Sequence, residues 1–505
     1  MLFNSLEFIF LFLPLTLWIF FQINSLVSHQ WSIVWLVAAS LGFYAWSYPP
    51  YLGLLLLSIL FNYGIGLALS DRIPILLSKK GLLILGIALN LTLLGYFKYT
   101  NFFVSTVNDF LGTTFNLNTI ILPLGISFFT FGQITYLVDS YRGETPDYNV
   151  LNYCFFVSFF PKIFAGPIVR YNELIPQLDN QSIYQFNPEN IAVGLTLFSL
   201  GLFKKIVFAD SIAAYVTPVF NGAVQGVPVA FFEAWGGALA YSLQLYFDFS
   251  GYSDMAIGVA RMFGIKLPLN FDSPYKAVNI IDFWHRWHIT LSNFLRDYLY
   301  IPLGGNRQGE VRRYINLMIT MLLGGLWHGA GWTFVFWGGL HGLYLSINHQ
   351  WRSFRKSLGH DLKKTHWWSQ TLASFITFIA VVGSWVFFRA ETINAAIAIL
   401  KGMSGISGVN GVLIPSYLFP KLMVVMSFLL LIVGFTPNTQ QWLIQYKPVF
   451  EEQIIETTSG LSNGSAKMWQ WQPNQLFGFI LGILLFLIAK TSLTASPSNF
   501  VYFNF

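Results

Sequence analysis

The sequence predicts an all-α, polytopic integral membrane protein in which residues 1–505 form a single domain. Three observations lead to this prediction. Only 10% of the residues are charged, whereas soluble proteins carry about 25%. Hydrophobic residues make up 55% of the chain, and no repeat or low-complexity tract divides it. Apolar stretches recur with short gaps, many of them near the length of about 20 residues that crosses a bilayer as a helix.

Thirteen stretches are candidates for membrane helices. They cover residues 3–22, 31–47, 50–70, 81–99, 118–138, 150–167, 191–218, 229–249, 313–329, 331–350, 368–388, 417–436 and 474–491. Several fall short of the ~30 Å hydrocarbon core, so we expect roughly 11 full spans together with re-entrant or interfacial helices. Such interruptions are tolerated at membrane depth only where protein surrounds them or where they line a cavity.

The first stretch lies within MLFNSLEFIFLFLPLTLWIFFQI, which has neither the basic start nor the cleavage site of a signal peptide. We therefore expect a retained first helix. Charges in the loops predict that the N-terminus lies outside the cell. Residues 71–80 and 352–364 carry several lysines and arginines, whereas residues 100–118 carry none. The acidic stretch at 451–456 is accordingly expected outside, and TTSGLSNGSAK at 457–467 is expected to form a surface loop.

The net charge of +6 raises the question of nucleic-acid binding. The basic residues lie in short loops between apolar runs and form no stripe with interleaved aromatic residues. Membrane lipids, and not nucleic acid, are therefore the expected partners. The single cysteine, Cys154, lies in the apolar run LNYCFFVSFF. One cysteine allows no intrachain disulfide and no cysteine metal cluster, and packing is its expected role.

Candidate chemistry is concentrated between Asp272 and His341. This region holds four of the eight histidines, together with Arg286, Arg296 and Asp297, although apolar stretches surround it. Ionisable groups at membrane depth are costly and usually face a cavity, a pathway or a partner. We therefore expect a reaction site here, with the rest of the chain as the wall of a tunnel that leads to it.

His285 and His288 lie three residues apart in NIIDFWHRWHITLSNF, a spacing that places both on one face of a helix. The same stretch is amphipathic and rich in tryptophan. It therefore also suits an interfacial helix whose histidines bind headgroups or backbone carbonyls. A metal pair would need a third ligand at a fixed spacing, and none follows, so no metal site is expected.

His328 lies in LLGGLWHGAGWTFVFWGG, between glycines that let a ligand or a second backbone approach closely. Imidazole is the side chain best suited to taking a proton at neutral pH. His328 is therefore either a core residue with satisfied hydrogen bonds or a catalytic base. His341, in GGLHGLY, is better explained by packing.

Three further stretches place polar residues inside apolar helices. They are PLGISFFTFGQITYLVDSYRG at 123–143, FFPKIFAGPIVRY at 159–171 and YSLQLYFDFSGYSDMAIGVARMFGI at 241–265. The two prolines of the second stretch must break its helix. These polar groups suit hydrogen bonds between helices as well as a polar passage through the membrane, and the pattern leaves both open.

At these residues the chain resembles the membrane-bound O-acyltransferase family, in particular the bacterial branch that contains the membrane subunit of alginate O-acetylation. The resemblance is clearest over residues 120–395. The matching blocks are PLGISFFTFGQITYLVDSYRG, FFPKIFAGPIVRY, GLFKKIVFAD, LYFDFSGYSDMAIGVARMFGIKLPLNFDSPY, DFWHRWHITLSNFLRDYLYIPLGGNR, GLWHGAGWTFVFWGGLHG and WVFFRAET. The family fold is a ring of membrane helices around a thinned centre with a central tunnel, and the same is expected here.

The resemblance also assigns roles to residues. His328 matches the histidine of the family's WHG motif, which is regarded as catalytic, and His288 matches the histidine of RWH, near the same tunnel. His285 stands where this branch is expected to have arginine, so we give it no catalytic role. As general base, His328 would contribute about 10²-fold to 10⁴-fold to the rate.

The implied activity is membrane O-acyl transfer. An acetyl or similar short acyl group would pass from a cytoplasmic thioester, such as acetyl-CoA, to an extracytoplasmic polysaccharide, either alginate-like or another exopolysaccharide or cell-wall glycan. An exported acetyltransferase is an expected partner, the inner or plasma membrane the expected location, and no tightly bound cofactor is expected. Two alternatives stay open: an acyltransferase for a lipid or protein acceptor, and a transporter or channel, although the sequence lacks the matching halves frequent in transporters.

Overall fold

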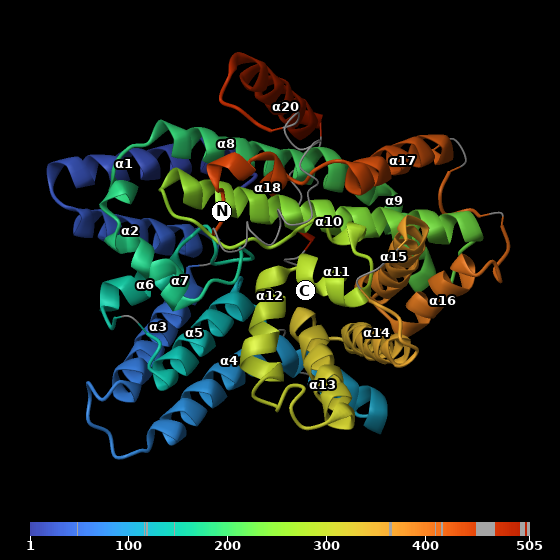
Figure 1. The fold of residues 1–505 in the computed structure, drawn as a ribbon, viewed down its shortest axis with the longest axis horizontal. Helices are drawn as coiled ribbons and strands as arrows, with labels where there is room; N and C mark the ends of the chain where they lie inside the picture. The colour runs from blue at the N-terminus through green and yellow to red at the C-terminus, as the bar shows by residue number, and fades with distance from the viewer. Residues whose placement is uncertain are drawn as a thin grey trace.

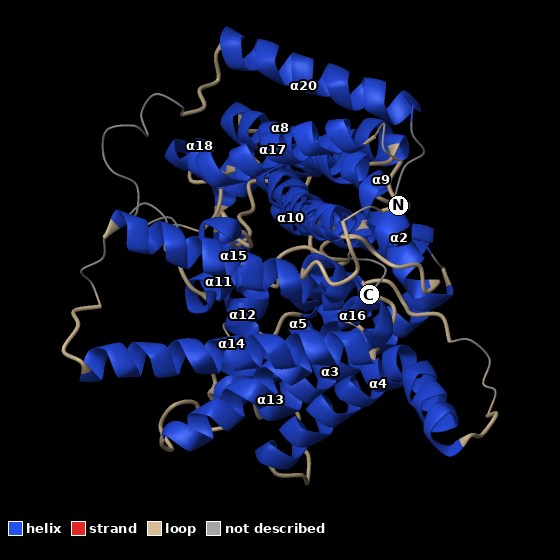
Figure 2. Ribbon diagram, turned by 90° about the vertical axis from the view of Figure 1, so that its right-hand side faces the viewer, coloured by secondary structure: helices blue, strands red, loops and turns tan. Residues whose placement is uncertain are grey.

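The computed structural model describes residues 1–505 except positions 48, 116, 118–119, 146, 363–365, 410, 416–417, 451–469, 495–499 and 502–505. Every regular element in this described part is a helix, as the sequence predicts (Figures 1 and 2). The acidic stretch at 451–456 and the loop at 457–467 lie outside the described residues, so their predicted positions stay predictions.

The N-terminal part is a set of long apolar helices. These are η1 (Phe8–Phe12), α1 (Leu13–Leu26), α2 (His29–Ser47), α3 (Pro50–Leu69), α4 (Lys79–Leu111) and α5 (Ile126–Arg142). Local chemistry sets their ends. The Ser78 hydroxyl accepts a hydrogen bond from the Gly81 N–H at the start of α4 (3.2 Å), and α4 ends at Leu111, before Gly112, whose φ of +63° suits glycine. The stretch expected at 118–138 becomes helical only from Ile126.

The middle of the chain contains the central helix of the molecule. Its elements are α6 (Val150–Ser158), α7 (Tyr171–Leu174), η2 (Ile175–Asp179), η3 (Gln181–Tyr184), α8 (Pro188–Phe203), η4 (Lys204–Ala209), α9 (Asp210–Val224) and α10 (Phe231–Met262). Helix α10 packs against α8 and α9. A Cβ atom added at Gly194 would lie 2.5 Å from the carbonyl oxygen of Gly258, so glycine lets the two backbones touch.

The last third of the chain surrounds α10 with further helices. They are η5 (Pro274–Lys276), α11 (Ile280–Arg286), α12 (Ile289–Leu295), η6 (Arg296–Tyr300), α13 (Glu310–His328), α14 (Trp332–Ser357), α15 (Trp367–Arg389), α16 (Ile393–Met403), α17 (Phe419–Phe435), α18 (Thr439–Trp442), η7 (Ile444–Tyr446) and α20 (Gln475–Thr494). Helices α13 and α14 pack against each other along their lengths, and α15 packs on α14.

Six helical segments of the described part are long and apolar enough to cross a membrane. They are Phe8–Leu26, Pro50–Leu69, Lys79–Leu111, Pro188–Val224, Trp367–Arg389 and Gln475–Ser492. The sequence predicted roughly 11 full spans from a length of about 20 apolar residues. Two features of the structure explain part of the difference between these six segments and the predicted number of spans. The expected span at 150–167 stops at Ser158, ahead of its two prolines, and α10 carries buried acids within its length. The chain is a multi-pass membrane protein.

A buried ion-pair cluster lies inside the bundle. The Lys205 ammonium contacts Asp248 and Asp210, each at 2.8 Å, and both Lys205 and Asp248 are fully buried. Asp248 also accepts a hydrogen bond from the Val501 N–H at 3.0 Å. The neighbouring Phe500 ring lies 4.6 Å from that of Tyr252 on α10. The cluster therefore connects three helical elements with a segment near the C-terminus.

Candidate active site

The backbone turns sharply at His288. Helix α11 ends at Arg286, and His288 adopts φ +44° and ψ +53°, a left-handed conformation, before α12 begins. Such a conformation is costly for a residue with a Cβ atom, and it persists only where the surroundings impose it. The expectation that His285 and His288 share one helical face is therefore wrong. His285 is exposed, whereas His288 is fully buried.

The segment before α11 holds His288 in this conformation. The Ile289 N–H donates to the Asn270 carbonyl at 3.0 Å, and the Asp272 N–H donates to the Arg286 carbonyl at 2.9 Å. The side chain is fixed as well, because His288 Nδ1 lies 3.0 Å from Asn270 Oδ1. Asn270, which the sequence analysis did not single out, is fully buried.

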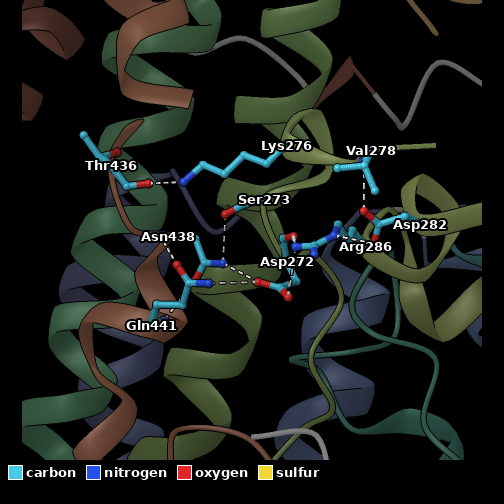
Figure 3. A network of polar contacts seen from close by, with 9 residues as sticks. All are labelled: Asp272, Ser273, Lys276, Val278, Asp282, Arg286, Thr436, Asn438 and Gln441. Carbon is cyan, nitrogen blue, oxygen red and sulfur yellow. Dashed lines mark hydrogen bonds and ion pairs between the residues drawn. The ribbon is translucent and has the colours of Figure 1, made fainter. Parts of the chain in front are cut away.

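A polar network anchors the other end of this segment (Figure 3). Asp272 accepts hydrogen bonds from Asn438 (2.7 Å) and Gln441 (3.4 Å), and its carboxylate lies 3.6 Å from Arg286. Asn438 also donates to the Ser273 hydroxyl at 3.1 Å. The turn that carries His288 is thus tied both to α11 and to the start of α18.

His328 is the last residue of α13 and is 96% buried, with a relative exposure of 4%. Its ring lies about 5 Å from the rings of Trp327, Trp337 and Phe388. The ring of His288 is 6.3 Å away. The structure therefore brings together the two histidines that the resemblance placed at the site, although 40 positions separate them in the chain.

His341 has a different environment. Its Nδ1 accepts a hydrogen bond from the Trp284 indole at 3.2 Å, and its Nε2 lies 3.0 Å from the Ser384 hydroxyl. Both ring nitrogens have partners and the residue is fully buried. This arrangement supports the packing role expected from the sequence.

Glycines around His328 allow α13 and α14 to touch. A Cβ atom at Gly325 would lie 2.3 Å from the Phe334 carbonyl oxygen, and one at Gly338 would lie 2.3 Å from that of Met321. Of the two uses considered for these glycines, the structure favours the approach of a second backbone over a ligand. Close packing fixes the end of α13 and therefore the position of His328.

Lys98 is a site residue that the sequence analysis missed. It lies on α4, is buried, and its ammonium donates to the carbonyls of Trp327 and His328, the latter at 3.2 Å. Its Nζ is also 3.5 Å from the Ser127 hydroxyl. The carbonyls at a helix C-terminus lack partners within the helix and attract cations. In the sequence, the polar segment FKYTN resembles a helix end, and nothing nearby connects it to a residue 230 positions away.

Two cavities lie along α13. The smaller, about 90 Å³, is lined by Lys98, Ser127, Trp327 and His328 together with the chain at 122–126. The larger, about 810 Å³, is lined by Leu317 and Met321 of α13, His349 of α14 and residues of α11, α12 and η6. Helix α13 thus faces the larger cavity with its middle, through Leu317, Thr320 and Met321, and the smaller cavity with His328 at its end.

Helix α5 runs from the smaller cavity toward Arg170 of the larger cavity. Its first residues, Ile126 and Ser127, line the smaller cavity. Its last, Arg142, lies over the Tyr298 ring, and so does Arg170, which lines the larger cavity. The 17 residues of α5 correspond to a length of about 25 Å. The start of α5 therefore lies at the smaller cavity, and its end lies near Arg170 of the larger cavity.

The larger cavity is polar and has charges of both signs. Arg286 pairs with Asp282 at 2.7 Å, and Arg296 pairs with Asp297 at 2.7 Å. Burial raises the pKa of Asp297, but hydrogen bonds from Arg296 and Arg170 outweigh it, so this pKa lies below its usual range. Asp297 therefore stays ionised and orients the two guanidinium groups. In the described part of the chain, no group of three His, Cys, Asp or Glu residues lies close enough to hold a metal ion.

These features define a class of protein, a multi-pass helical membrane protein with a buried histidine pair beside a cavity that His328 lines. The model of the membrane-bound O-acyltransferase family, MBOAT, matches residues 84–387. The chain belongs to this family and is an acyltransferase. This confirms the resemblance inferred from the sequence.

Relatives agree with this assignment. The chain is 45% identical to a peptidoglycan O-acetyltransferase of Helicobacter pylori, over 81% of each chain. It is 42% identical to the probable alginate O-acetylase AlgI of Pseudomonas aeruginosa, over 80% of this chain and 75% of that protein. A teichoic acid D-alanyltransferase of Streptococcus thermophilus is 29% identical over 52% of this chain and 68% of its own.

Proposed function

We propose that this protein transfers an acetyl group from a cytoplasmic thioester to an extracytoplasmic polysaccharide, with His328 as the general base. The observation that carries the proposal is the position of His328, at the wall of the smaller cavity and 6.3 Å from His288, with the larger cavity along the middle of α13. Two substrates entering from opposite sides would meet at this histidine pair.

The chemistry needs one proton acceptor at the point of attack. His328 removes the proton from the acceptor hydroxyl while its oxygen attacks the acyl carbon of the thioester. The tetrahedral intermediate then expels the thiolate as the carbon–sulfur bond breaks, and the imidazolium of His328 returns the proton to sulfur. Exclusion of water by the surrounding Trp327, Trp337 and Phe388 rings protects the thioester from hydrolysis.

Loop charges support the direction of transfer. Helix α4 begins at Lys79, close to the basic residues Arg72 and Lys80. Helix α14 runs past His349, which lines the larger cavity, toward the basic segment that begins at Arg352. Lysine and arginine collect on the cytoplasmic side of membrane proteins. The larger cavity is therefore the entrance for acetyl-CoA or another acyl thioester, which is a substrate and not a bound cofactor. The host membrane is the inner or plasma membrane.

The relatives support a polysaccharide acceptor. Their names give acetylation of peptidoglycan, acetylation of alginate and D-alanylation of teichoic acid. These acceptors are all envelope or exported polymers. We infer that the present protein acetylates a polymer of this kind, either directly or by passing the acetyl group to an exported acetyltransferase.

The test compares ester-linked acetate on exported glycans of the wild-type strain, a deletion strain, and deletion strains that express His328→Ala or wild-type protein. The proposal expects loss of the acetate in the deletion and in His328→Ala at equal protein levels, with recovery by the wild-type gene. Full acetylation in His328→Ala would contradict the role of His328. Unchanged acetate in the deletion would contradict the glycan acceptor and favour another acyl group, a lipid or protein acceptor, or transport.

A further inference from the structure

We propose that Asn270 is a positioning residue that fixes the hydrogen of the His288 ring on Nδ1, which leaves Nε2 as the acceptor nitrogen of the ring. The position of the ring hydrogen is inferred from hydrogen-bond geometry alone. Its consequence for catalysis rests on the proposed function. Four residues carry it: Asn270, Ser253, Thr290 and His288. All are buried, with relative exposures of 0%, 2%, 5% and 0%.

The first step is the orientation of the Asn270 amide. Its Nδ2 donates to the Ser253 hydroxyl at 3.0 Å. Its Oδ1 lies 3.4 Å from the backbone nitrogen of Thr290 and 2.9 Å from the Thr290 hydroxyl. A backbone N–H can only donate, so the amide atom that faces Thr290 must be the oxygen.

The Thr290 hydroxyl independently indicates the same orientation of the Asn270 amide. Its oxygen accepts a hydrogen bond from the Ile168 N–H at 3.0 Å. Its single hydrogen is therefore available for Asn270 Oδ1, and a flipped amide would instead place two N–H hydrogens against Thr290. Two donors on Thr290 thus identify the amide oxygen without reference to the histidine.

The second step concerns the imidazole. Asn270 Oδ1 has no hydrogen to donate, so His288 Nδ1, 3.0 Å away, must be the donor. A neutral imidazole carries one ring hydrogen. Nε2 is then the acceptor nitrogen, able to receive a hydrogen bond or a proton from a hydroxyl. The opposite tautomer would place the ring hydrogen on Nε2.

The backbone adds rigidity to this arrangement. The Asn270 carbonyl accepts from the Ile289 N–H at 3.0 Å, so one residue holds both the ring and the left-handed turn of His288. An outer residue that fixes the tautomer and orientation of a functional histidine typically contributes about 10-fold to 100-fold to function, as metal sites show. Asn270 has this relation to His288.

The functional test uses membranes that carry the protein and its acceptor polymer, supplied with acetyl-CoA, with ester-linked acetate as the readout across a pH series. Asn270→Leu should lower the maximal rate about 10-fold to 100-fold. Asn270→Asp should keep a larger share of the rate, because a carboxylate also accepts from Nδ1–H. A carboxylate stabilises the imidazolium, so the acidic limb of the pH profile should move to higher pH.

Asn316→Asp is the matched control. Asn316 is also fully buried, on α13, and donates to the Gly305 carbonyl at 3.0 Å without contacting His288. Its aspartate variant should leave the acidic limb where the wild type has it. An unshifted limb in Asn270→Asp at normal protein levels would overturn the inference.

A spectroscopic measurement is independent of catalysis. Protein labelled with ¹⁵N-histidine, compared with His288→Gln to assign the ring signals, should show a protonated Nδ1 and an unprotonated Nε2 for His288. Asn270→Leu should lose this pattern. The reverse pattern in the wild type would overturn the inference even if transfer activity is present, whereas the expected pattern with no acetyl transfer would contradict only the proposed function.

Discussion

At the scale of the residue, the site depends on side chains that hold the histidines. Lys98 donates to the carbonyls of Trp327 and His328, and Asn270 contacts His288. Both residues act by holding a part of the site in place, and neither has to contact a substrate to do so. A displacement of about 1 Å in a catalytic group can cost about 10²-fold in rate.

Lys98→Met provides the first prediction at this scale. The variant keeps the length of the side chain but removes the donor to two carbonyls at the end of α13. Loss of such a buried partner costs about 1–3 kcal/mol. We expect a lower unfolding temperature in detergent and strongly reduced acetylation. Lys79→Met is the control, because Lys79 forms an exposed pair with Asp71 that contributes about 1 kcal/mol or less. Equal behaviour of the two variants would contradict the anchoring role.

Sequence reasoning found part of the site at this scale. His328 and His288 were identified because ionisable residues stand out in an apolar chain and because they match family motifs. The left-handed turn at His288 was missed, since it depends on Asn270 and Asp272, which pair with the backbone from a separate segment. Lys98 was missed because its partner is more than 200 residues away.

At the scale of the element, the contact between α13 and α14 sets where His328 lies. The two helices approach so closely that Gly338 has the Met321 carbonyl where a Cβ atom would be. The neighbouring Gly339 has room, because the nearest atom to a Cβ added there, a methyl carbon of Leu322, would lie 3.6 Å away. A side chain at position 338 would therefore collide with α13, whereas one at the adjacent position 339 would not.

This difference gives the second prediction. Gly338→Ala forces the helices apart, and overpacking of this kind costs about 1–3 kcal/mol. We expect a lower unfolding temperature and reduced acetylation. Gly339→Ala should be neutral or slightly stabilising, because alanine favours a helix over glycine by about 1 kcal/mol. Thermal unfolding of both purified variants checks this. If Gly338→Ala unfolds at the wild-type temperature, the proposed role of close packing is wrong.

Helix ends were predicted best where the apolar stretch and the helix coincide. The stretches expected at 31–47 and 50–70 correspond to α2 and α3, whose ends differ from the prediction by two residues or fewer. The stretch expected at 150–167 failed, because its apolar residues continue past the end of α6 into an irregular segment packed inside the protein. Apolar composition alone does not distinguish a helix from a buried loop.

At the scale of the whole molecule, the Lys205 cluster joins α10, η4 and α9. Lys205→Met leaves the fully buried carboxylate of Asp248 without its cation, and breaking a buried pair in this way costs about 3–5 kcal/mol. We expect low yields of folded protein by size-exclusion chromatography. The double variant Lys205→Met/Asp248→Asn removes both charges and should recover part of the yield. No recovery would show that the cluster contributes more than charge balance.

The central claim is that an acyl group passes at His328 between two faces of the protein. Membrane vesicles of known orientation test it most directly, with acetyl-CoA labelled in its acetyl group, since this charged thioester does not cross a bilayer. The account predicts labelled ester on the acceptor polymer only in inside-out vesicles, where the donor reaches the cytoplasmic face, and loss of that label in His328→Ala. Equal labelling in right-side-out vesicles, or full labelling in His328→Ala, would contradict it.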